Sequence, residues 1–273
     1  MLKIRIITSL VLIPLFLAAL FLLSNRNWSL LMLAIIGLAG FEWATICKFP
    51  SLIQKLFVGS LLIAGFIVSF KLPLNYLSLG IHDIMLVTTV SAVLIWSIVI
   101  PLWLYCQPNL QRPGLMFLVG FILLFSTWLA FLSLREMNPW LLLIAVVTVW
   151  LADTGAYFAG KQFGKHKLAP HISPNKTWEG VAGALLVVTL VSALLCFYYK
   201  QNYLVIVFLW WITIFSVVGD LFESLLKRQA HLKDSGNLLP GHGGILDRID
   251  GLLGAMPVAA FIVHFPIYQL ILS

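Results

Sequence analysis

The sequence predicts an all-α fold, a polytopic integral membrane helix bundle with about nine transmembrane helices. Two observations on composition predict this class, since 61% of the 273 residues are hydrophobic and only 10% are charged. An ordinary soluble domain is about 25% charged, and a globule with so few charges could not cover its surface with polar groups. The composition therefore excludes a soluble enzyme, a disordered chain and a secreted disulfide scaffold.

The third observation is the length of the apolar runs. A spanning helix needs roughly 20 mostly apolar residues, and we count nine candidates. In chain order they are Ile6–Leu23, Trp28–Cys47, Leu56–Phe70, Ile84–Tyr105, Leu115–Leu134, Pro139–Ala159, Val181–Tyr199, Tyr203–Val218 and Leu252–Leu272. The third and eighth runs are short. Strands of a membrane barrel are excluded because the runs are long and do not alternate apolar with polar residues.

Individual spans carry further signals. Lys3 and Arg5 precede the first run, as in a signal peptide, but eight more spans follow, so we expect an uncleaved first helix. Trp28, Trp140 and Trp178 stand at the starts of spans, where aromatic side chains anchor helices at the membrane interface.

The distribution of charge predicts the topology. Thirteen of the 17 Lys and Arg residues fall on one side of the membrane, and only Arg26, Lys71, Arg135 and Lys200 fall on the other. The positive-inside rule then places the N-terminus in the cytoplasm and the C-terminus outside. We expect the basic side to lie against anionic head groups of the lipid bilayer. No basic patch with interleaved aromatic residues suggests nucleic-acid binding.

Polar residues concentrate in two loops, 160–180 and 219–251, which this topology places in the cytoplasm. Seven of the ten acidic residues lie in or beside them: Asp153, Glu179, Asp220, Glu223, Asp234, Asp247 and Asp250. Carboxylates and bases alternate there next to helix ends, which indicates a site. We interpret 1–273 as a single membrane domain, with spans 1–5 in 1–138 and spans 6–9 in 139–273.

The start of the second loop predicts a polar helix face. Asp220, Glu223, Ser224 and Lys227 are spaced i, i+3, i+4, i+7, so they share one side of a helix that leaves the membrane. The simpler alternative is a solvated face with a Glu223–Lys227 pair.

Glycines surround His242 further along the same loop. Gly241, Gly243 and Gly244 lack Cβ atoms, which lets consecutive N–H groups point into one concavity that suits a phosphate. The alternative is a flexible turn.

Asp247 and Asp250 follow, three residues apart, so one helical turn would bring both carboxylates to one side. Oxygen ligands of this kind, together with substrate phosphates, are what Mg²⁺ prefers. The alternative is a helix N-terminus with favourable acids.

The first loop has its own polar group. Asp153 lies in an apolar span, where exposure to lipid would cost about 2.5–3.5 kcal/mol, so it should face a polar cavity or a partner. The segment Ser173–Gly180 precedes a helix and suits phosphate binding at its N-terminus, or Thr177 simply caps that helix. Glu42, inside the second span, is expected to pair with a nearby base. Gly155–Gln162 nearly matches a phosphate loop, but no strand precedes it, and we reject that reading.

The second loop resembles the signature of the phosphatidate cytidylyltransferases, or CDP-diacylglycerol synthases. The matching positions are Ser224, Lys227, Arg228, Lys233, Asp234, Gly236, Pro240, His242, Gly243, Gly244, Asp247, Arg248 and Asp250, with no departure from the pattern. Asp153–Tyr157 and Ser173–Gly180 resemble two upstream motifs of this family, and Met1–Ile7 looks like the start of bacterial members. The resemblance is strongest over 153–251 and extends loosely over the whole chain.

The resemblance implies a nucleotidyltransferase of phospholipid biosynthesis that condenses CTP with phosphatidic acid into CDP-diacylglycerol and pyrophosphate. It implies a requirement for Mg²⁺, with K⁺ as an optional second cation, and a homodimer. It further implies a multi-pass protein of the bacterial cytoplasmic (inner) membrane whose active site, in the catalytic part 139–273, faces the cytoplasm.

The resemblance and the residue types together assign roles within the site. The expected metal ligands are Asp220, Asp247 and Asp250, which with Lys227 and Arg248 form the expected catalytic set. The expected substrate-binding residues are Asp153, Ser173, Asn175, Lys176, Thr177, Glu223, Ser224, Arg228, Lys233, Asp234, His242, Gly243 and Gly244.

Two other functions stay open at the level of the sequence. A membrane transporter would also place charges inside its spans, although paired interrupted spans in two repeated halves would be more typical. The other alternative is a related cytidylyltransferase that acts on another lipid phosphate.

Overall fold

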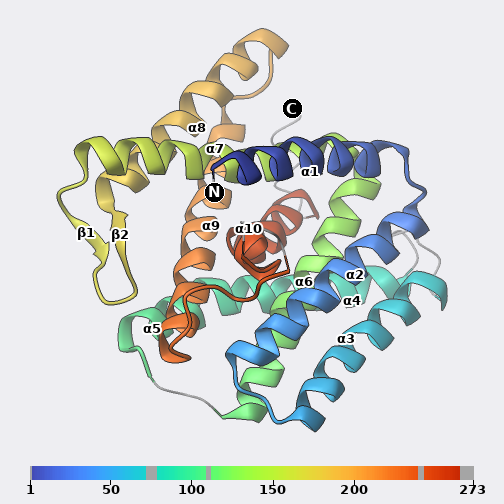
Figure 1. The fold of residues 1–273 in the computed structure, drawn as a ribbon. Helices are drawn as coiled ribbons and strands as arrows, with labels where there is room; N and C mark the ends of the chain where they lie inside the picture. The colour runs from blue at the N-terminus through green and yellow to red at the C-terminus, as the bar shows by residue number, and fades with distance from the viewer. Residues whose placement is uncertain (1, 72–78, 109–111, 239–242, 265–273) are drawn as a thin grey trace.

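The computed structural model describes residues 2–71, 79–108, 112–238 and 243–264, and this part of the chain is almost entirely helical (Figure 1). The helices are α1 (Leu2–Leu22), α2 (Asn25–Ile46), α3 (Ser51–Lys71), α4 (Leu79–Leu94), α5 (Ile100–Cys106), α6 (Pro113–Met137), α7 (Pro139–Phe163), α8 (Trp178–Tyr199), α9 (Leu204–Gln229) and α10 (Leu246–His264). A π-helical turn, Ile95–Val99, joins α4 to α5. The chain is a polytopic all-α membrane protein.

Seven helical segments in the described residues are long and apolar enough to cross a membrane, and they coincide with the second to eighth predicted spans. The first predicted span falls on α1. The ninth begins within α10, and its residues 265–272 lie outside the described part of the chain. The eighth span differs most from its prediction, because α9 continues to Gln229 and carries the predicted polar face on the same helix as the span.

α10 lies at the centre of the bundle, among α2, α6 and α9 (Figure 1). Every residue from Gly251 to Ala260 is buried. The hydroxyl of Thr127 in α6 donates a hydrogen bond to the carbonyl oxygen of Leu253, 3.3 Å away. Neighbouring helices therefore hold the middle of α10 firmly, and its first turn projects toward the polar loops.

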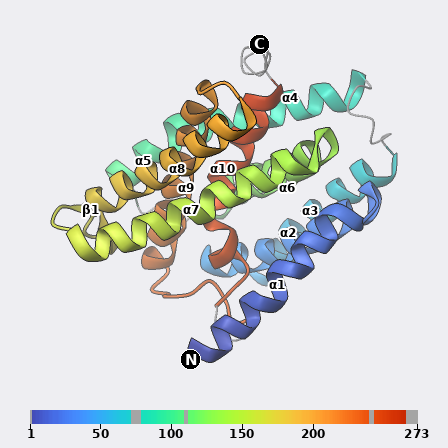
Figure 2. The same ribbon diagram turned by 90° about the horizontal axis from the view of Figure 1, so that it is seen from above.

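α1 lies beside one end of α7, as Figure 2 shows from above, and contacts it through ring pairs such as Phe16 with Trp150. Its C-terminal end is held by Arg135, which donates hydrogen bonds to the carbonyl of Leu20 at 2.8 Å and to Asn25 Oδ1 at 2.6 Å.

The predicted tryptophan anchors have different environments. Trp140 and Trp178 are exposed, as the interface prediction requires. Trp28 is buried and donates a hydrogen bond to the carbonyl of Phe131, so its predicted role as an interface anchor is wrong. Its ring packs instead under the guanidinium of Arg135, 5.2 Å from the ring centroid.

α7 and α8 cross at very short range. A Cβ atom on Gly155 would lie only 2.9 Å from the carbonyl oxygen of Gly183, so the helices can approach this closely only with glycine there. The glycines of the rejected phosphate-loop match thus serve helix packing.

A two-stranded antiparallel sheet connects α7 to α8. The predicted all-α fold did not include this sheet. Its strands are β1 (Lys167–Ala169) and β2 (Ser173–Thr177), with Lys167 opposite Thr177. β2 leads directly into α8, where the Thr177 hydroxyl accepts a hydrogen bond from the N–H of Gly180 at 3.1 Å. The predicted cap on α8 is therefore confirmed.

Candidate active site

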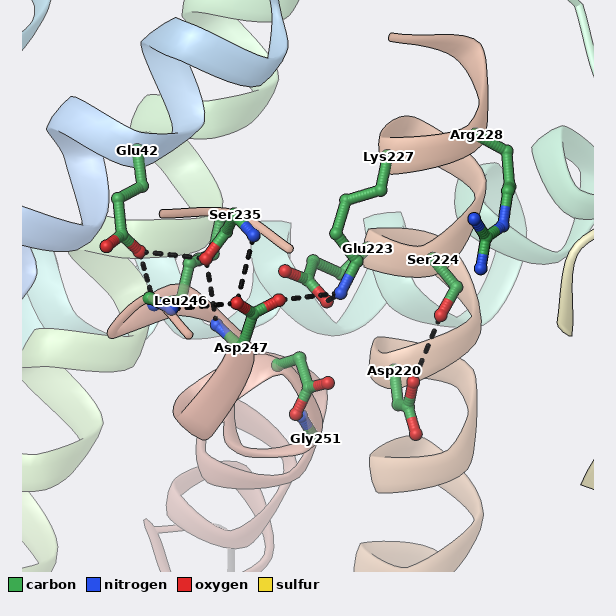
Figure 3. A network of polar contacts seen from close by, with 12 residues as sticks. Glu42, Asp220, Glu223, Ser224, Lys227, Arg228, Ser235, Leu246, Asp247 and Gly251 are labelled. Atoms are coloured by element: carbon green, nitrogen blue, oxygen red, sulfur yellow. Dashed lines mark hydrogen bonds and ion pairs between the residues drawn. The ribbon is translucent and has the colours of Figure 1, made fainter. Parts of the chain in front are cut away.

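Polar side chains of the second loop gather at one end of the bundle, where α9 ends and α10 begins (Figure 3). Lys227 Nζ in α9 lies 2.7 Å from Asp247 Oδ1 in α10. Lys176 Nζ in β2 lies 2.5 Å from Asp220 Oδ2 in α9. Residues from both predicted polar stretches are therefore assembled into one region.

The polar face of α9 forms as the spacing predicts. Ser224 Oγ donates a hydrogen bond to Asp220 Oδ1 at 3.2 Å, and Lys227 Nζ lies 2.6 Å from Glu223 Oε2. The Glu223 side chain is 1% exposed and that of Lys227 is 12% exposed. The pair is therefore buried, and the alternative of a solvated face is wrong.

Asp247 has both carboxylate oxygens engaged. Oδ1 contacts Lys227, and Oδ2 accepts hydrogen bonds from the N–H groups of Ser235 at 2.9 Å and Gly244 at 2.8 Å. Asp247 lies in the first turn of α10, ahead of its apolar part. Burial raises the pKa of Asp247, but the hydrogen bonds from Lys227, Gly244 and Ser235 outweigh burial, so the pKa stays below its ordinary value.

The glycines before α10 are required by this arrangement. Gly243 has a φ of +82°, and a Cβ atom on it would lie 2.6 Å from Asp247 Oδ2. A Cβ atom on Gly244 would collide with the side chains of Ser235 and Glu42. The Gly244 N–H, which the sequence assigns to a phosphate, donates to Asp247 instead.

Glu42 reaches this region from α2 (Figure 3). Its Oε1 accepts a hydrogen bond from Ile245 N–H at 3.0 Å, and its Oε2 accepts from Leu246 N–H at 2.7 Å and from Ser235 Oγ at 3.0 Å. These groups, in the described part of the chain, are its partners in place of a base, so the predicted pairing of Glu42 with a base is wrong.

These contacts define two sets of side chains. We call the first set the inner network, which is buried or nearly so and consists of Glu42, Glu223, Lys227, Ser235 and Asp247. We call the second set the outer group, which is more accessible and consists of Asp153, Lys176, Asp220, Arg248 and Asp250.

The members of the outer group interact mainly through charge, with repulsion among the carboxyl groups and attraction between them and the bases. Asp153 interacts electrostatically with Asp220, Lys176 and Arg248. Asp250 interacts with Asp220 and Lys176, and also with Glu223 of the inner network. The Asp250 Oδ1 accepts a hydrogen bond from the N–H of Gly251 at 2.7 Å. α7, β2, α9 and α10 thus each contribute to one charged surface.

Carboxyl groups outnumber bases at this end of the bundle. Besides Glu42, five carboxyl groups interact with three bases: Asp153, Asp220, Glu223, Asp247 and Asp250 with Lys176, Lys227 and Arg248. The buried Oε1 of Glu223 has no hydrogen-bond partner within the described residues. The donor chemistry therefore fits a hard divalent cation. Across the described ranges, however, no three acidic, His or Cys side chains are close enough to hold one as they stand.

The other predicted substrate-binding residues surround the two sets. Arg228 Nε donates a hydrogen bond to the carbonyl of Ile172 at 3.4 Å and so ties α9 to the hairpin. Asn175, Lys233 and Asp234 are exposed, and Ser173 is partly buried. Thr177 is buried in its capping role. His242 lies outside the described residues.

Sequence reasoning missed two contributors to the site, Ser235 and Glu42. Ser235 bridges Glu42 and Asp247, yet no pattern marked it. Glu179 was grouped with the site, but its carboxylate contacts His166, with Oε1 2.6 Å from Nδ1, and stabilises the base of the hairpin. For Glu42, the available signal was an acidic residue in an apolar span, which favours a functional contact without naming the partner.

Comparison with known proteins gives consistent matches. The model of the cytidylyltransferase family matches residues 3–266. The phosphatidate cytidylyltransferase of Pseudomonas aeruginosa is 36% identical, with 95% of this chain and 96% of that protein covered. The enzyme of the same name from Haemophilus influenzae is 35% identical, with 97% and 99% covered. The one from Bacillus subtilis is 43% identical over 53% of this chain and 58% of its own length.

Proposed function

The chain belongs to the cytidylyltransferase family, and from this premise we propose how its polar end carries out the reaction. The protein is a nucleotidyltransferase that condenses CTP with phosphatidate, forming CDP-diacylglycerol and pyrophosphate. The mechanism rests on one observation: buried and accessible charged side chains lie together at one end of a membrane helix bundle. A lipid phosphate and a water-soluble nucleotide can both reach such a position.

The chemical step is an attack of the phosphatidate phosphate oxygen on the α-phosphorus of CTP. The new P–O bond forms as the bond to the β-phosphate oxygen breaks, and pyrophosphate carries away the electron pair. A phosphate is already ionised near neutral pH, so alignment matters more than a general base. The main obstacle is the mutual repulsion of two anionic reactants.

Bases of the site would offset that repulsion. Lys176 and Arg248 of the outer group are positioned by carboxylates and can exchange those contacts for phosphate oxygens. Arg228 and Lys233 are further bases assigned to phosphates, as are His242 and Gly243 from the sequence alone, whereas the Gly244 N–H already donates to Asp247. Lys227 is different, because Glu223 and Asp247 already enclose it. Lys227 can therefore contact a phosphate only if the phosphate reaches the inner network.

We assign Mg²⁺ to Asp220, Asp247 and Asp250, with K⁺ as an optional second cation. The excess of carboxyl groups over bases supports this assignment, since a divalent cation would offset the remaining negative charge. Such an ion supplies charge neutralisation and polarisation of phosphoryl oxygens when bound. The Asp220 side chain is 33% exposed and that of Asp247 is 7% exposed, and Asp247 must also hold Lys227 and the loop before α10.

We further place this site on the cytoplasmic face of the bacterial inner membrane, in a homodimer. Thirteen of the 17 Lys and Arg residues lie in loops that the predicted topology puts on that side, where CTP is also found. A membrane-impermeant thiol reagent tests the orientation on a single cysteine introduced in place of exposed Asn237, in a variant without Cys106. Labelling in intact cells would contradict this placement. Static light scattering of the purified protein in detergent tests the homodimer.

The decisive experiment uses the purified full-length protein with CTP labelled in the cytidine, phosphatidate and Mg²⁺. We expect the label to enter a chloroform-soluble product, and a chelator to abolish this transfer. Replacing phosphatidate by a polyprenyl phosphate tests the alternative acceptor. Label that stays in the aqueous phase with every acceptor would contradict the proposed reaction.

A pair of variants tests the metal assignment. Asp250→Asn should lose transfer, with a higher Mg²⁺ concentration needed for any residual activity. The control is Thr127→Val, which removes a contact to the middle of α10 without touching the charged groups. An Asp250→Asn enzyme with unchanged Mg²⁺ dependence would refute a role of this residue at the metal.

A further inference from the structure

Glu42 is the feature of the molecule that the reaction does not use directly. Its side chain is 3% exposed and comes from α2, in the part of the chain that carries none of the family motifs. Within the described residues, its side chain makes three hydrogen bonds, to Ser235, Ile245 and Leu246, which lie 193 to 204 positions later in the chain. A buried carboxylate with this many long-range hydrogen bonds is expected to stabilise a particular arrangement of the segments that it contacts.

The first effect of Glu42 is on the start of α10. The first N–H groups of a helix have no partner within the helix. Glu42 accepts hydrogen bonds from two of the N–H groups at this start, those of Ile245 and Leu246. Negative charge is also favourable at a helix N-terminus. α2 therefore supplies the cap of α10, although the two helices lie far apart in the sequence.

The second effect passes through Ser235. Its Oγ donates to Glu42 Oε2 at 3.0 Å and accepts a hydrogen bond from the Asp247 N–H at 3.3 Å. Its own N–H donates to Asp247 Oδ2 at 2.9 Å. Asp247 in turn fixes Lys227 at 2.7 Å. A continuous chain of contacts thus leads from Glu42 to two residues of the catalytic set (Figure 3).

We propose that Glu42 is a positioning residue for cytidylyl transfer: it holds the Ser235 and Gly244–Leu246 segments so that Asp247 and Lys227 keep their working geometry. Glu42 contacts neither of these two side chains. This inference rests on the proposed function, and it adds a residue from outside the catalytic part to the machinery of the reaction.

The test compares four single variants of the full-length protein and the double variant Glu42→Gln/Ser235→Ala. Glu42→Gln keeps the size and one acceptor oxygen, and Glu42→Met keeps the approximate size without an acceptor. Ser235→Ala breaks the bridge from its other end. Thr127→Val is the matched control, because it also loses a hydrogen bond to α10 but at Leu253, in the middle of the helix. Each is assayed for kcat, KM for CTP, the Mg²⁺ midpoint and thermal unfolding.

We expect Glu42→Gln to lower kcat roughly 10- to 100-fold, as for residues that support metal ligands, with a smaller change in KM for CTP. The Mg²⁺ midpoint should rise, and Glu42→Met should be worse than Glu42→Gln. The losses of Glu42→Gln and Ser235→Ala should not multiply in the double variant, because both act through one bridge. Thr127→Val should lower the unfolding temperature and leave kcat and the Mg²⁺ midpoint unchanged.

A readout independent of activity separates this inference from the proposed function. Hydrogen–deuterium exchange of a peptide covering 243–249 should be faster in Glu42→Gln than in wild type, and unchanged in Thr127→Val. Faster exchange with kcat and the Mg²⁺ midpoint at wild-type values would overturn the positioning role. Unchanged exchange would overturn it as well. An inactive wild type would instead refute the proposed function, and exchange would still decide whether Glu42 holds this segment.

Discussion

The inner network and the outer group lie side by side and both consist mainly of acids and bases. They differ in how far their side chains are exposed and in how many contacts their charged groups make. In the inner network Asp247 has contacts on both oxygens, and Glu223 and Lys227 are almost inaccessible. In the outer group Asp220 is 33% exposed and Lys176 is 24% exposed. The difference suggests a division of labour, in which buried charges set a frame and accessible charges meet the reactants.

The largest expected effect comes from Lys227→Met, which leaves Glu223 and Asp247 buried without their base. Removing one partner of a buried pair costs about 3–5 kcal/mol, so the free energy of unfolding should fall by that order and transfer should be lost. Chemical unfolding in detergent measures the first effect. The double variant Lys227→Met/Glu223→Met should regain part of the stability and none of the activity. A Lys227→Met protein of wild-type stability would contradict the description of a buried frame.

Asp220→Asn should give the opposite pattern, a large loss of activity at little cost in stability. Asp220 is partly exposed, so its removal leaves Lys176 free to be hydrated. Asp220 is assigned to the Mg²⁺ that would neutralise charge on the phosphoryl oxygens, so its loss should lower kcat by about two to three orders of magnitude. Steady-state kinetics and thermal unfolding, run on the same preparation, measure the two effects. A drop in unfolding temperature as large as that of Lys227→Met would remove the distinction between the two sets.

Gly243→Ala should lower both the stability and the activity, each by less than the larger of the effects expected for Lys227→Met and Asp220→Asn. Its φ of +82° is unfavourable for alanine, and the added Cβ atom would lie 2.6 Å from Asp247 Oδ2. A non-glycine residue in such a conformation costs about 1–3 kcal/mol, and the displaced carboxylate should lower kcat. Gly59→Ala is the matched control, because a Cβ atom there meets nothing within 4 Å. Equal stability of the two variants would argue against strain at Gly243.

The smallest expected effect is that of Glu179→Gln, which lies outside both sets. The Glu179 carboxylate contacts the side chain of His166, which is 79% exposed, so solvent already screens this interaction. Kinetic constants should stay at wild-type values, and only cleavage of the hairpin by added protease should become faster. A clear rise in KM for CTP would place Glu179 in the substrate site and extend the outer group.

Local patterns predicted the fold class and much of the site. Long apolar runs identify the spans because a bilayer imposes a minimum helix length. The spacing of Asp220, Glu223, Ser224 and Lys227 predicts one face because helical geometry is local. The hairpin escaped prediction because Ser173–Thr177 is short, polar and contains proline, so it has no alternating apolar pattern.

Long-range contacts escaped prediction for a different reason. Glu42 and Ser235 are 193 positions apart, and neither hydrophobic periodicity nor motif spacing reports on contacts at that separation. The burial of Glu223 and Lys227 was missed on similar grounds, since Asp247, which contacts Lys227, lies on another helix 20 positions away. The sequence therefore indicates which residue types gather in the site, and the packing of distant helices decides which of them are fixed.

The contact between α2 and α10 has a consequence for biosynthesis. Ile245 leaves the ribosome 203 residues after Glu42, which at ~5–20 residues per second takes roughly 10–40 s. During that delay the nascent Glu42 has no N–H groups to accept from at the start of α10. Synthesis of α10 then supplies these partners, so a chain released before residue 245 lacks the contacts of Glu42 together with Asp247 and Asp250.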